Sequence, residues 1–312
     1  MIRIIAKLFA VTVIFTAFLH VAPVSAAPFT WVSATGSDAN ACTAALPCAT
    51  LYGAANHVDS GGQINCIDSP SFTFTNFGEL APLTIDCAGV YQTTSPNVGA
   101  IWTYSNVILR IRNLTISGTA GGYPAIKATG GGTLILENCV FENFNASGAG
   151  AALDIEPSSP FNLVVTNSRM SNSAAGVLLK PAAGGSVTAT FNGVTIDGNS
   201  GGGLKSDTTN GTVSVDISNS TISNNGGNGM NAVGGAGGTN MLNIHNSVIA
   251  KNGSAGVQAN GTNAAALIDT TLLDTNTAGA ISAIGSGRVL TYGNNRIIGA
   301  LGSGFTTSAP LQ

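Results

Sequence analysis

The stretch NSTISNNGGNGM, residues 219–230, contains the pattern that decides the fold. Its apolar residue Ile222 lies three places after one Asn and three places before another, and a Gly-Met pair follows. The same frame returns in NSVIAKNGSAGV, residues 246–257, around Ile249. Equivalent apolar anchors recur at nearly even intervals, at Ile116, Phe141, Met170, Ile196, Ile222, Ile249, Leu273 and Ile298. A repeat of this length indicates a solenoid.

The residues before each anchor show the periodicity of a strand. Positions seven and five before the anchors are mostly apolar, and the positions between them are mostly polar or mixed. The rest of each unit is rich in Gly, Asn, Ser and Thr, which favour turns and form helices poorly. A leucine-rich repeat needs a denser Leu pattern, and helical repeats need helix formers. The sequence therefore predicts an all-β parallel β-helix, a single-stranded solenoid with one coil per repeat.

The segment 1–26 has the pattern of a signal peptide. Arg3 and Lys7 precede an apolar run over positions 8–19, and Val-Ser-Ala at 24–26 forms a small-residue cleavage site. The apolar run is short for a membrane span. We therefore expect a secreted or periplasmic protein with no membrane span after cleavage.

Charge excludes one class of partner. Charged residues are 8% of the chain, and removal of Arg3 and Lys7 with the signal leaves 9 of the 11 basic residues against 14 acidic ones, a net charge of about −5. The remaining chain has no basic run. Nucleic acid is therefore not an expected partner.

Five cysteines in an exported chain permit disulfides. Cys42 and Cys48 flank the short loop TAALP, and we expect them to be bonded. Cys66 and Cys87 occupy matching places in two successive strand-like segments, where they either form a bond or stack unbonded as small inward residues. Cys139 has no His near it in sequence and is interpreted as a structural thiol rather than a nucleophile.

A cap is expected at the start of the solenoid. The segment PCATLYGAANHV, residues 47–58, predicts an amphipathic helix that covers the open end of the core. Its apolar face consists of Leu51, Ala54, Ala55 and Val58. We assign residues 27–68 to the cap and first strand, and residues 69–312 to the coils.

The Cys loop, the Pro-Cys pair, the capping helix and the segment GGQINCID resemble exported bacterial members of the pectin-lyase-like family. The resemblance covers nearly the whole chain after residue 26 and implies a right-handed parallel β-helix. The family includes lyases, hydrolases, epimerases, adhesins and proteins with no known reaction. The resemblance therefore does not select an activity.

Asparagine is the most regular polar feature of the repeat. Six Asn lie three places before anchors: Asn113, Asn138, Asn167, Asn219, Asn246 and Asn295. Stacked Asn can pass amide hydrogen bonds from rung to rung and tolerate a left-handed backbone, which predicts a structural ladder. A polar binding stripe is the alternative. A second set, Asn199, Asn225, Asn252 and Asn276, also indicates turn chemistry.

The motifs of the family's enzymes are absent from the sequence. There is no Gly-His-Gly, no Arg-x-Lys and no Asp-Pro-His-Asp, and the one Arg-x-Arg, Arg110 to Arg112, lacks the acidic surroundings expected of pectate lyases. No calcium-binding nonapeptide or EF-hand loop occurs. We therefore assign no catalytic residue, no cofactor and no metal.

Two constellations remain from the residues alone. Ser218, His245 and Asp269 fall in one outward column, the set needed for nucleophilic catalysis, although no oxyanion hole is evident and a polar ladder with a His–Asp pair explains them more simply. Four acidic residues on one coil could perform acid/base work on a glycoside: Glu137, Glu142, Asp154 and Glu156. Arg112 lies beneath Glu137, so a surface ion pair is the simpler explanation there.

Rings and loops indicate where a ligand could bind. The aromatic residues Trp31, Tyr52, Tyr91, Trp102, Tyr104 and Tyr123 all precede residue 124. The longest departures from the repeat follow Phe141 and occupy residues 231–240, and loops are the usual place for function on a rigid scaffold.

Two functions fit the sequence. The first is a non-catalytic β-helix that binds a polysaccharide or a cell surface through an extended polar face. The second is a polysaccharide lyase or glycoside hydrolase that acts on an extracellular polysaccharide. The absence of a charged catalytic cluster favours the first, and the family resemblance favours the second.

Overall fold

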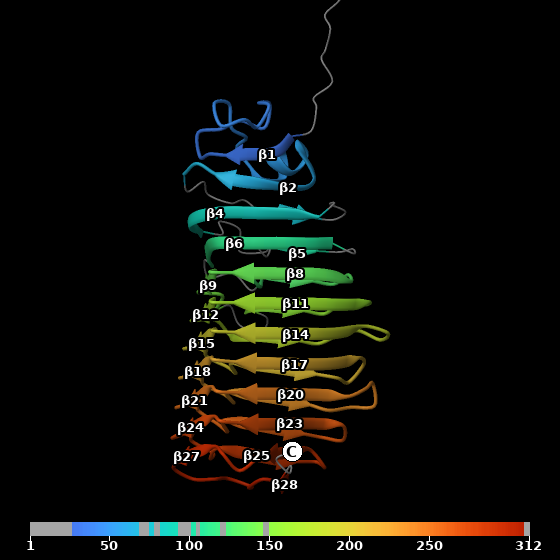
Figure 1. Ribbon diagram of the computed structural model, residues 1–312, viewed down its shortest axis with the longest axis vertical. Helices are drawn as coiled ribbons and strands as arrows, with labels where there is room; N and C mark the ends of the chain where they lie inside the picture. The colour runs from blue at the N-terminus through green and yellow to red at the C-terminus, as the bar shows by residue number, and fades with distance from the viewer. Residues whose placement is uncertain are drawn as a thin grey trace, which may run out of the picture.

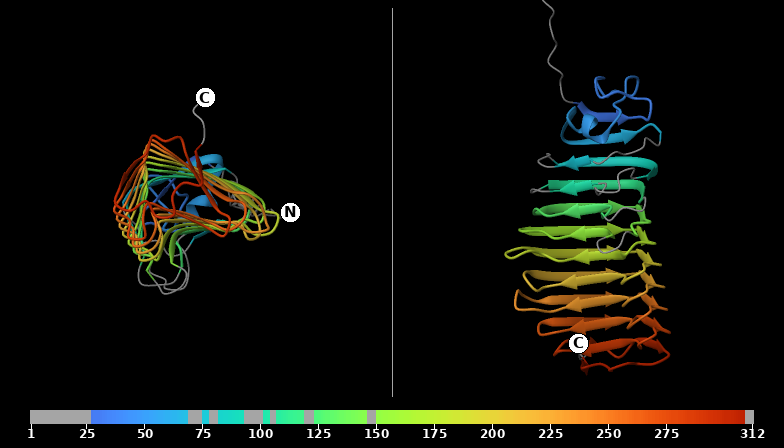
Figure 2. Two further views of the ribbon diagram at one scale, coloured as in Figure 1. Left: turned by 90° about the horizontal axis from the view of Figure 1, so that it is seen from below. Right: turned by 180° about the vertical axis from the view of Figure 1, so that it is seen from behind.

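The computed structural model is a column of coils stacked along one axis (Figure 1). It describes residues 27–68, 75–77, 82–92, 101–103, 107–118, 123–145 and 150–308, so the expected signal peptide lies outside the described residues. Seen along the axis, equivalent strands of successive coils superimpose and give a roughly triangular outline (Figure 2). No helix in the described ranges is long and apolar enough to cross a membrane.

The described strands form two parallel sheets. One has nine strands: β3 (Thr75–Phe77), β5 (Ile101–Thr103), β7 (Ile126–Ala128), β10 (Ala151–Ile155), β13 (Ala175–Leu179), β16 (Leu204–Asp207), β19 (Met230–Val233), β22 (Val257–Asn260) and β25 (Ile281–Ile284). The other has nineteen and includes the first strands, β1 (Ala27–Val32), β2 (Val58–Cys66), β4 (Leu83–Gln92) and β6 (Val107–Ser117).

From β8 to β27 the nineteen-stranded sheet alternates longer and shorter strands. The longer ones are β8 (Gly132–Glu137), β11 (Pro160–Thr166), β14 (Ser186–Asn192), β17 (Thr212–Ser218), β20 (Asn240–His245), β23 (Ala264–Asp269) and β26 (Arg288–Thr291). The shorter ones are β9 (Val140–Glu142), β12 (Arg169–Ser171), β15 (Thr195–Asp197), β18 (Thr221–Ser223), β21 (Val248–Ala250), β24 (Leu272–Asp274) and β27 (Arg296–Ile298). The final strand is β28 (Thr307–Ser308). Each coil therefore runs from the nine-stranded sheet to a longer strand, then to a shorter one.

The repeat anchors form the core, as the sequence predicts. Seven of them are at most 1% exposed: Ile116, Phe141, Met170, Ile196, Ile222, Ile249 and Leu273. Ile222 stacks in register between Ile196 and Ile249. The fold is a right-handed parallel β-helix, and this prediction is confirmed.

The last coil corrects the assigned register. Leu273 pairs with Ile297, and the predicted anchor Ile298 is 39% exposed. Accordingly Asn294, not Asn295, reaches the ladder position, where its side-chain oxygen accepts a hydrogen bond from the Thr270 backbone N–H. The last coil is one residue shorter than the sequence alignment assumed, and even spacing alone could not reveal this.

The outward asparagines occupy a tight turn between the longer and shorter strands. The five correctly aligned ones have φ between 44° and 61°: Asn113, Asn138, Asn167, Asn219 and Asn246. Hydrogen bonds between side-chain amides run along part of this column: Asn246 donates to Asn219 at 2.7 Å, and Asn219 donates to Asn192 at 2.9 Å. These side chains are therefore engaged in holding neighbouring turns together.

The second asparagine set forms the more continuous ladder. The side-chain amides of the first three members each donate to the side-chain oxygen of the next, at 2.9 to 3.0 Å, and the last donates to the Ile249 carbonyl oxygen. The residues are buried: Asn199, Asn225, Asn252 and Asn276. Buried amides of this kind must be hydrogen-bonded, and here each rung satisfies its neighbour.

A short helix closes the N-terminal end. α1 (Leu51–Ala55) is shorter than the predicted 47–58, because Thr50 is its N-cap and accepts a hydrogen bond from the Gly53 N–H at 2.9 Å. The backbone of Cys48 pairs with Val32 of β1 in an isolated parallel β-bridge. The capping helix is confirmed in kind, while Val58 begins β2 rather than continuing the helix.

The expected Cys42–Cys48 disulfide is present, and of the two alternatives for Cys66 and Cys87 the structure has the bonded one. Cys42–Cys48 closes the loop before α1, and Cys66–Cys87 joins β2 to β4 with Cα atoms 4.8 Å apart. Cys139 is buried and free, and burial raises the pKa of its thiol to about 11. A thiol in this state is a poor nucleophile, which agrees with the structural interpretation.

Candidate functional site

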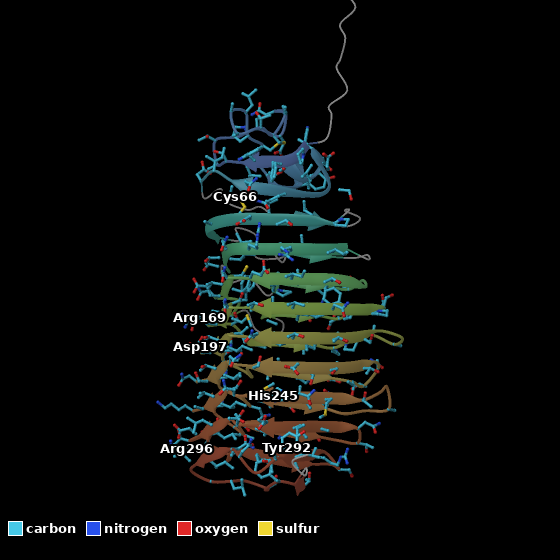
Figure 3. All side chains as sticks on the ribbon, viewed as in Figure 1. Cys66, Arg169, Asp197, His245, Tyr292 and Arg296 are labelled. Atoms are coloured by element: carbon cyan, nitrogen blue, oxygen red, sulfur yellow. A yellow bond between two sulfur atoms is a disulfide. The ribbon has the colours of Figure 1, made fainter. Side chains whose placement is uncertain are left out.

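The suggested Ser–His–Asp triad does not assemble. Ser218, His245 and Asp269 do stack in one column of the nineteen-stranded sheet, and His245 is visible on the front of the column in Figure 3. However, the Ser218 hydroxyl donates to Asn192, and His245 lies between two carboxylates, 3.6 Å from Asp216 and 3.6 Å from Asp269. Without a serine–histidine hydrogen bond this column is a polar ladder.

The charged pairs of this sheet also differ from the expected ones. Arg112 bonds Asp86 at 2.9 Å rather than Glu137, and Arg110 approaches Glu137 at 3.5 Å. Arg112 has a carboxylate in its column on each side, Asp86 on β4 and Glu137 on β8, so its position in the column does not fix the partner. At the corner, Arg169 donates two hydrogen bonds of 2.8 and 2.7 Å to Asp197 (Figure 3).

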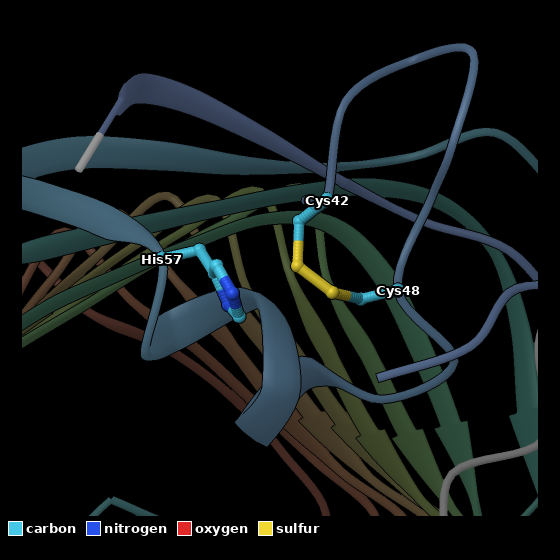
Figure 4. Close-up of side chains that lie close together, drawn as sticks. All are labelled: Cys42, Cys48 and His57. Atoms are coloured by element: carbon cyan, nitrogen blue, oxygen red, sulfur yellow. A yellow bond between two sulfur atoms is a disulfide. The ribbon is translucent and has the colours of Figure 1, made fainter. Parts of the chain in front are cut away.

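The cap contains a group of potential metal ligands. Cys42, Cys48 and His57 have ligand atoms within 4.8 Å of one another (Figure 4). The two sulfurs are joined to each other, and His57 Nδ1 lies 2.9 Å from the Gly53 carbonyl oxygen. In the disulfide form neither sulfur is a thiolate, which is the form of cysteine that binds metals. We therefore interpret this group as structural.

Charges gather on the outward face of the nine-stranded sheet. Among the described residues, six lie on or just beyond four neighbouring strands, β7, β10, β13 and β16. We call them the charged cluster: Lys127, Asp154, Glu156, Lys180, Lys205 and Asp207. The expected acidic group is therefore split, because Glu137 and Glu142 lie on β8 and β9 of the other sheet.

Lys127 is the hub of the charged cluster. Its ammonium contacts Asp154 at 2.7 Å and Glu156 at 2.9 Å. Burial lowers the pKa of Lys127, but hydrogen bonds to the two carboxylates outweigh it and raise that pKa overall. Lys127 therefore stays protonated and serves as a fixed positive charge rather than as a base.

Asp154 is the most unusual member. Strand alternation directs it outward, yet the residue is only 7% exposed. Burial raises its pKa, even though the hydrogen bond and charge of Lys127 act in the opposite direction. Its Oδ1 is buried and has no hydrogen-bond partner among the described residues. Asp154 is therefore a buried carboxyl group with one oxygen that can still accept a hydrogen bond.

The other members differ in exposure. Lys180 is exposed and acts electrostatically on Asp154. Lys205 pairs with Asp207 at 3.3 Å, and Thr209 donates to Asp207 through both its backbone and its hydroxyl. Although burial opposes it, these bonds lower the pKa of Asp207, which remains ionised. The face thus presents the side chains of Glu156, Lys180 and Lys205 to solvent beside the buried carboxyl groups of Asp154 and Asp207.

The sequence pointed to only two members of the charged cluster. Asp154 and Glu156 were candidates, whereas the lysines and Asp207 were not. A signal was present, because residues that stack here recur near the repeat length: Lys127 precedes Asp154 by 27 places, and Lys180 precedes Asp207 by 27. The sequence predictions rested on the columns of the longer strands and not on those of the nine-stranded sheet.

Comparison with known families decides the classification. A family model described as a right handed beta helix region matches residues 98–277, more than half of the chain. The chain belongs to the right-handed β-helix family. No curated protein matches it.

Three solved structures match most of the chain. The crystal structure of pectate lyase Pel9A matches with a TM-score of 0.64 and 16% identity, over 90% of this chain and 78% of that one. The GH136 lacto-N-biosidase from Eubacterium ramulus gives 0.48 and 11% identity, over 91% and 67%. The A-module of mannuronan C-5 epimerase AlgE6 from Azotobacter vinelandii gives 0.31 and 14%, over 91% and 89%. At so low an identity, the likeness to the pectate lyase shows the fold alone.

Proposed function

We propose that the protein is exported and binds an extracellular polysaccharide at the charged cluster on its nine-stranded sheet. The concentration of charge carries the proposal: the chain has 11 basic and 14 acidic residues, and six of these occupy four adjacent strands. Lysine ammonium groups donate hydrogen bonds and carboxylates accept them, which suits a ligand covered in hydroxyl groups. Rungs roughly 4.8 Å apart present these groups as a regular row.

Support also comes from the parts around the charged cluster. Two disulfides fit an oxidising compartment outside the cytosol. The rigid stack holds the row in place without a ligand, so little ordering entropy is lost on binding. The fold occurs in a pectate lyase, which acts on a polysaccharide according to its name.

Binding to a panel of neutral and acidic polysaccharides tests the proposal. Lys180→Gln/Lys205→Gln should weaken the affinity at least about tenfold, because two charge-assisted contacts are lost. Lys251→Gln is the matched control, since Lys251 is an exposed lysine on another face. Equal binding by the double variant and the wild type, with folding unchanged, would refute the site.

Cleavage is the second candidate, and the raised pKa of Asp154 favours it. A carboxyl group with a raised pKa is better suited to act as a general acid, and Glu156 can supply the second carboxylate. Both contact the same ammonium, so they lie close enough to act on one glycosidic bond, for which retaining glycosidases use separations of roughly 5 to 5.5 Å.

The two candidates separate when binding, reducing ends and unsaturated products are followed in one incubation. Turnover that Glu156→Gln abolishes, while polysaccharide binding persists, would establish the hydrolase. Unsaturated products would instead indicate a lyase. Binding without turnover above that of a heat-inactivated control leaves the non-catalytic function.

A further inference from the structure

The first two strands carry an exposed aromatic pair far from the charged cluster. Phe29 is 50% exposed, and its ring centroid lies 6.3 Å from that of Trp31, with the planes tilted by 50°. Both residues project outward from β1, because the intervening Thr30 is fully buried. An exposed phenylalanine beside a tryptophan is an unusual feature on a charge-poor surface, and it offers a stacking platform.

A hollow of about 340 Å³ adjoins Phe29. It lies at the lower end of the size range of ligand pockets, roughly 300–1,000 Å³. The polar side chains at its rim are those of Asp59, Ser60, Gln63 and Thr84. Asp59 and Ser60 are exposed, and their side chains make no hydrogen bond within the part of the chain that the structure describes.

The floor beside the hollow is held rigid. The Gln63 side chain accepts a hydrogen bond from Arg112 at 2.9 Å and donates one to Asn65 at 2.6 Å. Gln63 and Asn65 are the register partners of Phe29 and Trp31 on β2. The platform and its polar floor are therefore fixed on paired strands before any ligand arrives.

We propose that this platform and hollow form a second carbohydrate site, which binds the ring of a neutral hexopyranose in a glycan chain. The apolar C–H face of the sugar would stack on Phe29, and its hydroxyls would donate to the Asp59 carboxylate and contact Ser60 and Thr84. The single charge of the lining is the acidic Asp59, which disfavours a uronic acid. The site does not depend on the charged cluster.

Tryptophan fluorescence provides the test in a Trp102→Phe background, because Trp31 adjoins the site. The other tryptophan of the chain, Trp102, pairs in register with Lys127 of the charged cluster and would report binding there. The folded protein, with both disulfides intact, would be titrated with cellohexaose, mannohexaose, laminarihexaose and, as the acidic counterpart, hexagalacturonate. We expect one of the neutral oligosaccharides to change the emission and to bind more tightly than hexagalacturonate. Phe29→Ala should weaken that binding about tenfold, and Phe29→Tyr should largely restore it.

Tyr52→Ala is the matched control, since Tyr52 is an equally exposed ring, 56%, on α1 and does not line the hollow. Its binding should equal that of the wild type, as should that of Lys180→Gln/Lys205→Gln, which tests the other site. The proposal is overturned if no neutral hexasaccharide binds at millimolar concentration, or if Phe29→Ala and Tyr52→Ala behave alike. Tighter binding of hexagalacturonate or of an aromatic-rich peptide would also overturn it.

Discussion

Ionisation of the buried Asp154 carboxyl group destabilises the folded state. Burial raises its pKa despite the ammonium of Lys127 at 2.7 Å, so the carboxylate loses more from desolvation than it gains from its partner. Because the native pKa lies above the unfolded value, stability falls as the pH rises through the native pKa and stays lower above it. A residue kept in such a place is a candidate for function.

Asp154→Asn should therefore leave the free energy of unfolding at pH 7 unchanged or raise it by up to about 1 kcal/mol. The gain from removing the buried charge is partly offset by the weaker hydrogen bond to Lys127. At about pH 2, well below the unfolded pKa of about 3.9, the carboxyl is protonated in both states and the gain should disappear. Urea unfolding at both pH values measures the difference.

Lys127→Met is the informative companion. It removes the cation that Asp154 and Glu156 share, so it should cost about 2–3 kcal/mol at neutral pH. A larger loss for Asp154→Asn than for Lys127→Met would contradict the assignment of the raised pKa to burial.

Side-chain partners were the part of the molecule that the sequence predicted least well. The repeat places Arg112 and Glu137 in one column, and the structure confirms that register, yet the guanidinium selects Asp86 on the preceding rung. Likewise, alternation places Asp154 outward but does not reveal that it is buried there. A column position fixes a Cα atom, whereas long side chains and coverage by other segments decide contact and burial.

At the scale of the element, the cap and the first rungs depend on the two disulfides. Cys42–Cys48 closes a sequence separation of 6 and Cys66–Cys87 one of 21. If loop closure in the unfolded chain dominates, the longer loop stabilises more. The structure also places them differently, since the first holds the loop before α1 and the second joins successive rungs.

Replacing each pair with alanine should separate these contributions. Cys42→Ala/Cys48→Ala should lower the free energy of unfolding by about 2 kcal/mol, and Cys66→Ala/Cys87→Ala by about 3 kcal/mol. Denaturant melts of the oxidised proteins give both values. The reverse order would show that native contacts in the cap, rather than loop entropy, determine the effect.

Elements were predictable where the repeat is regular. Inward residues such as Ile196, Ile222 and Ile249 recur with little change in spacing, and the strands follow them. The last coil departs by one residue, so Ile297 replaces Ile298. The cap helix is shorter than predicted, because the hydrogen bond to Thr50 sets its start and Asn56 caps its end. The ends of such elements are decided by local hydrogen bonds, which the spacing of the sequence repeat does not reveal.

At the scale of the whole molecule, each coil contacts chiefly the coils above and below it, as the pairing of β14, β17 and β20 shows. Stability is then close to a sum of coil and interface contributions. One coil can therefore be deleted without a change of register if the first residue deleted and the first residue retained after it are register partners. Val215 pairs with Leu242, so joining Ser214 directly to Leu242 preserves the register.

Deletion of residues 215–241 should therefore give a folded, shorter solenoid that unfolds cooperatively at a lower temperature. Its Phe29 platform lies on β1, far along the axis, so its response to neutral oligosaccharides should be unchanged. Circular dichroism and thermal melting measure the first outcome, and tryptophan fluorescence the second.

Deletion of residues 215–240 is one residue shorter and shifts the register of the joined strand by one residue. It tests whether that register is needed for folding. Ser214 would then precede Met241, which turns Leu242 and Ile244 outward, directs Asn243 into the core and puts His245 at the turn position of Asn219. Each buried polar group without a partner costs about 1–3 kcal/mol, and the coils beyond the junction would lose their support. We expect an unfolded or aggregated product. If both deletions folded equally well, register would not control this solenoid, and the columns that define the charged cluster would lose their physical basis.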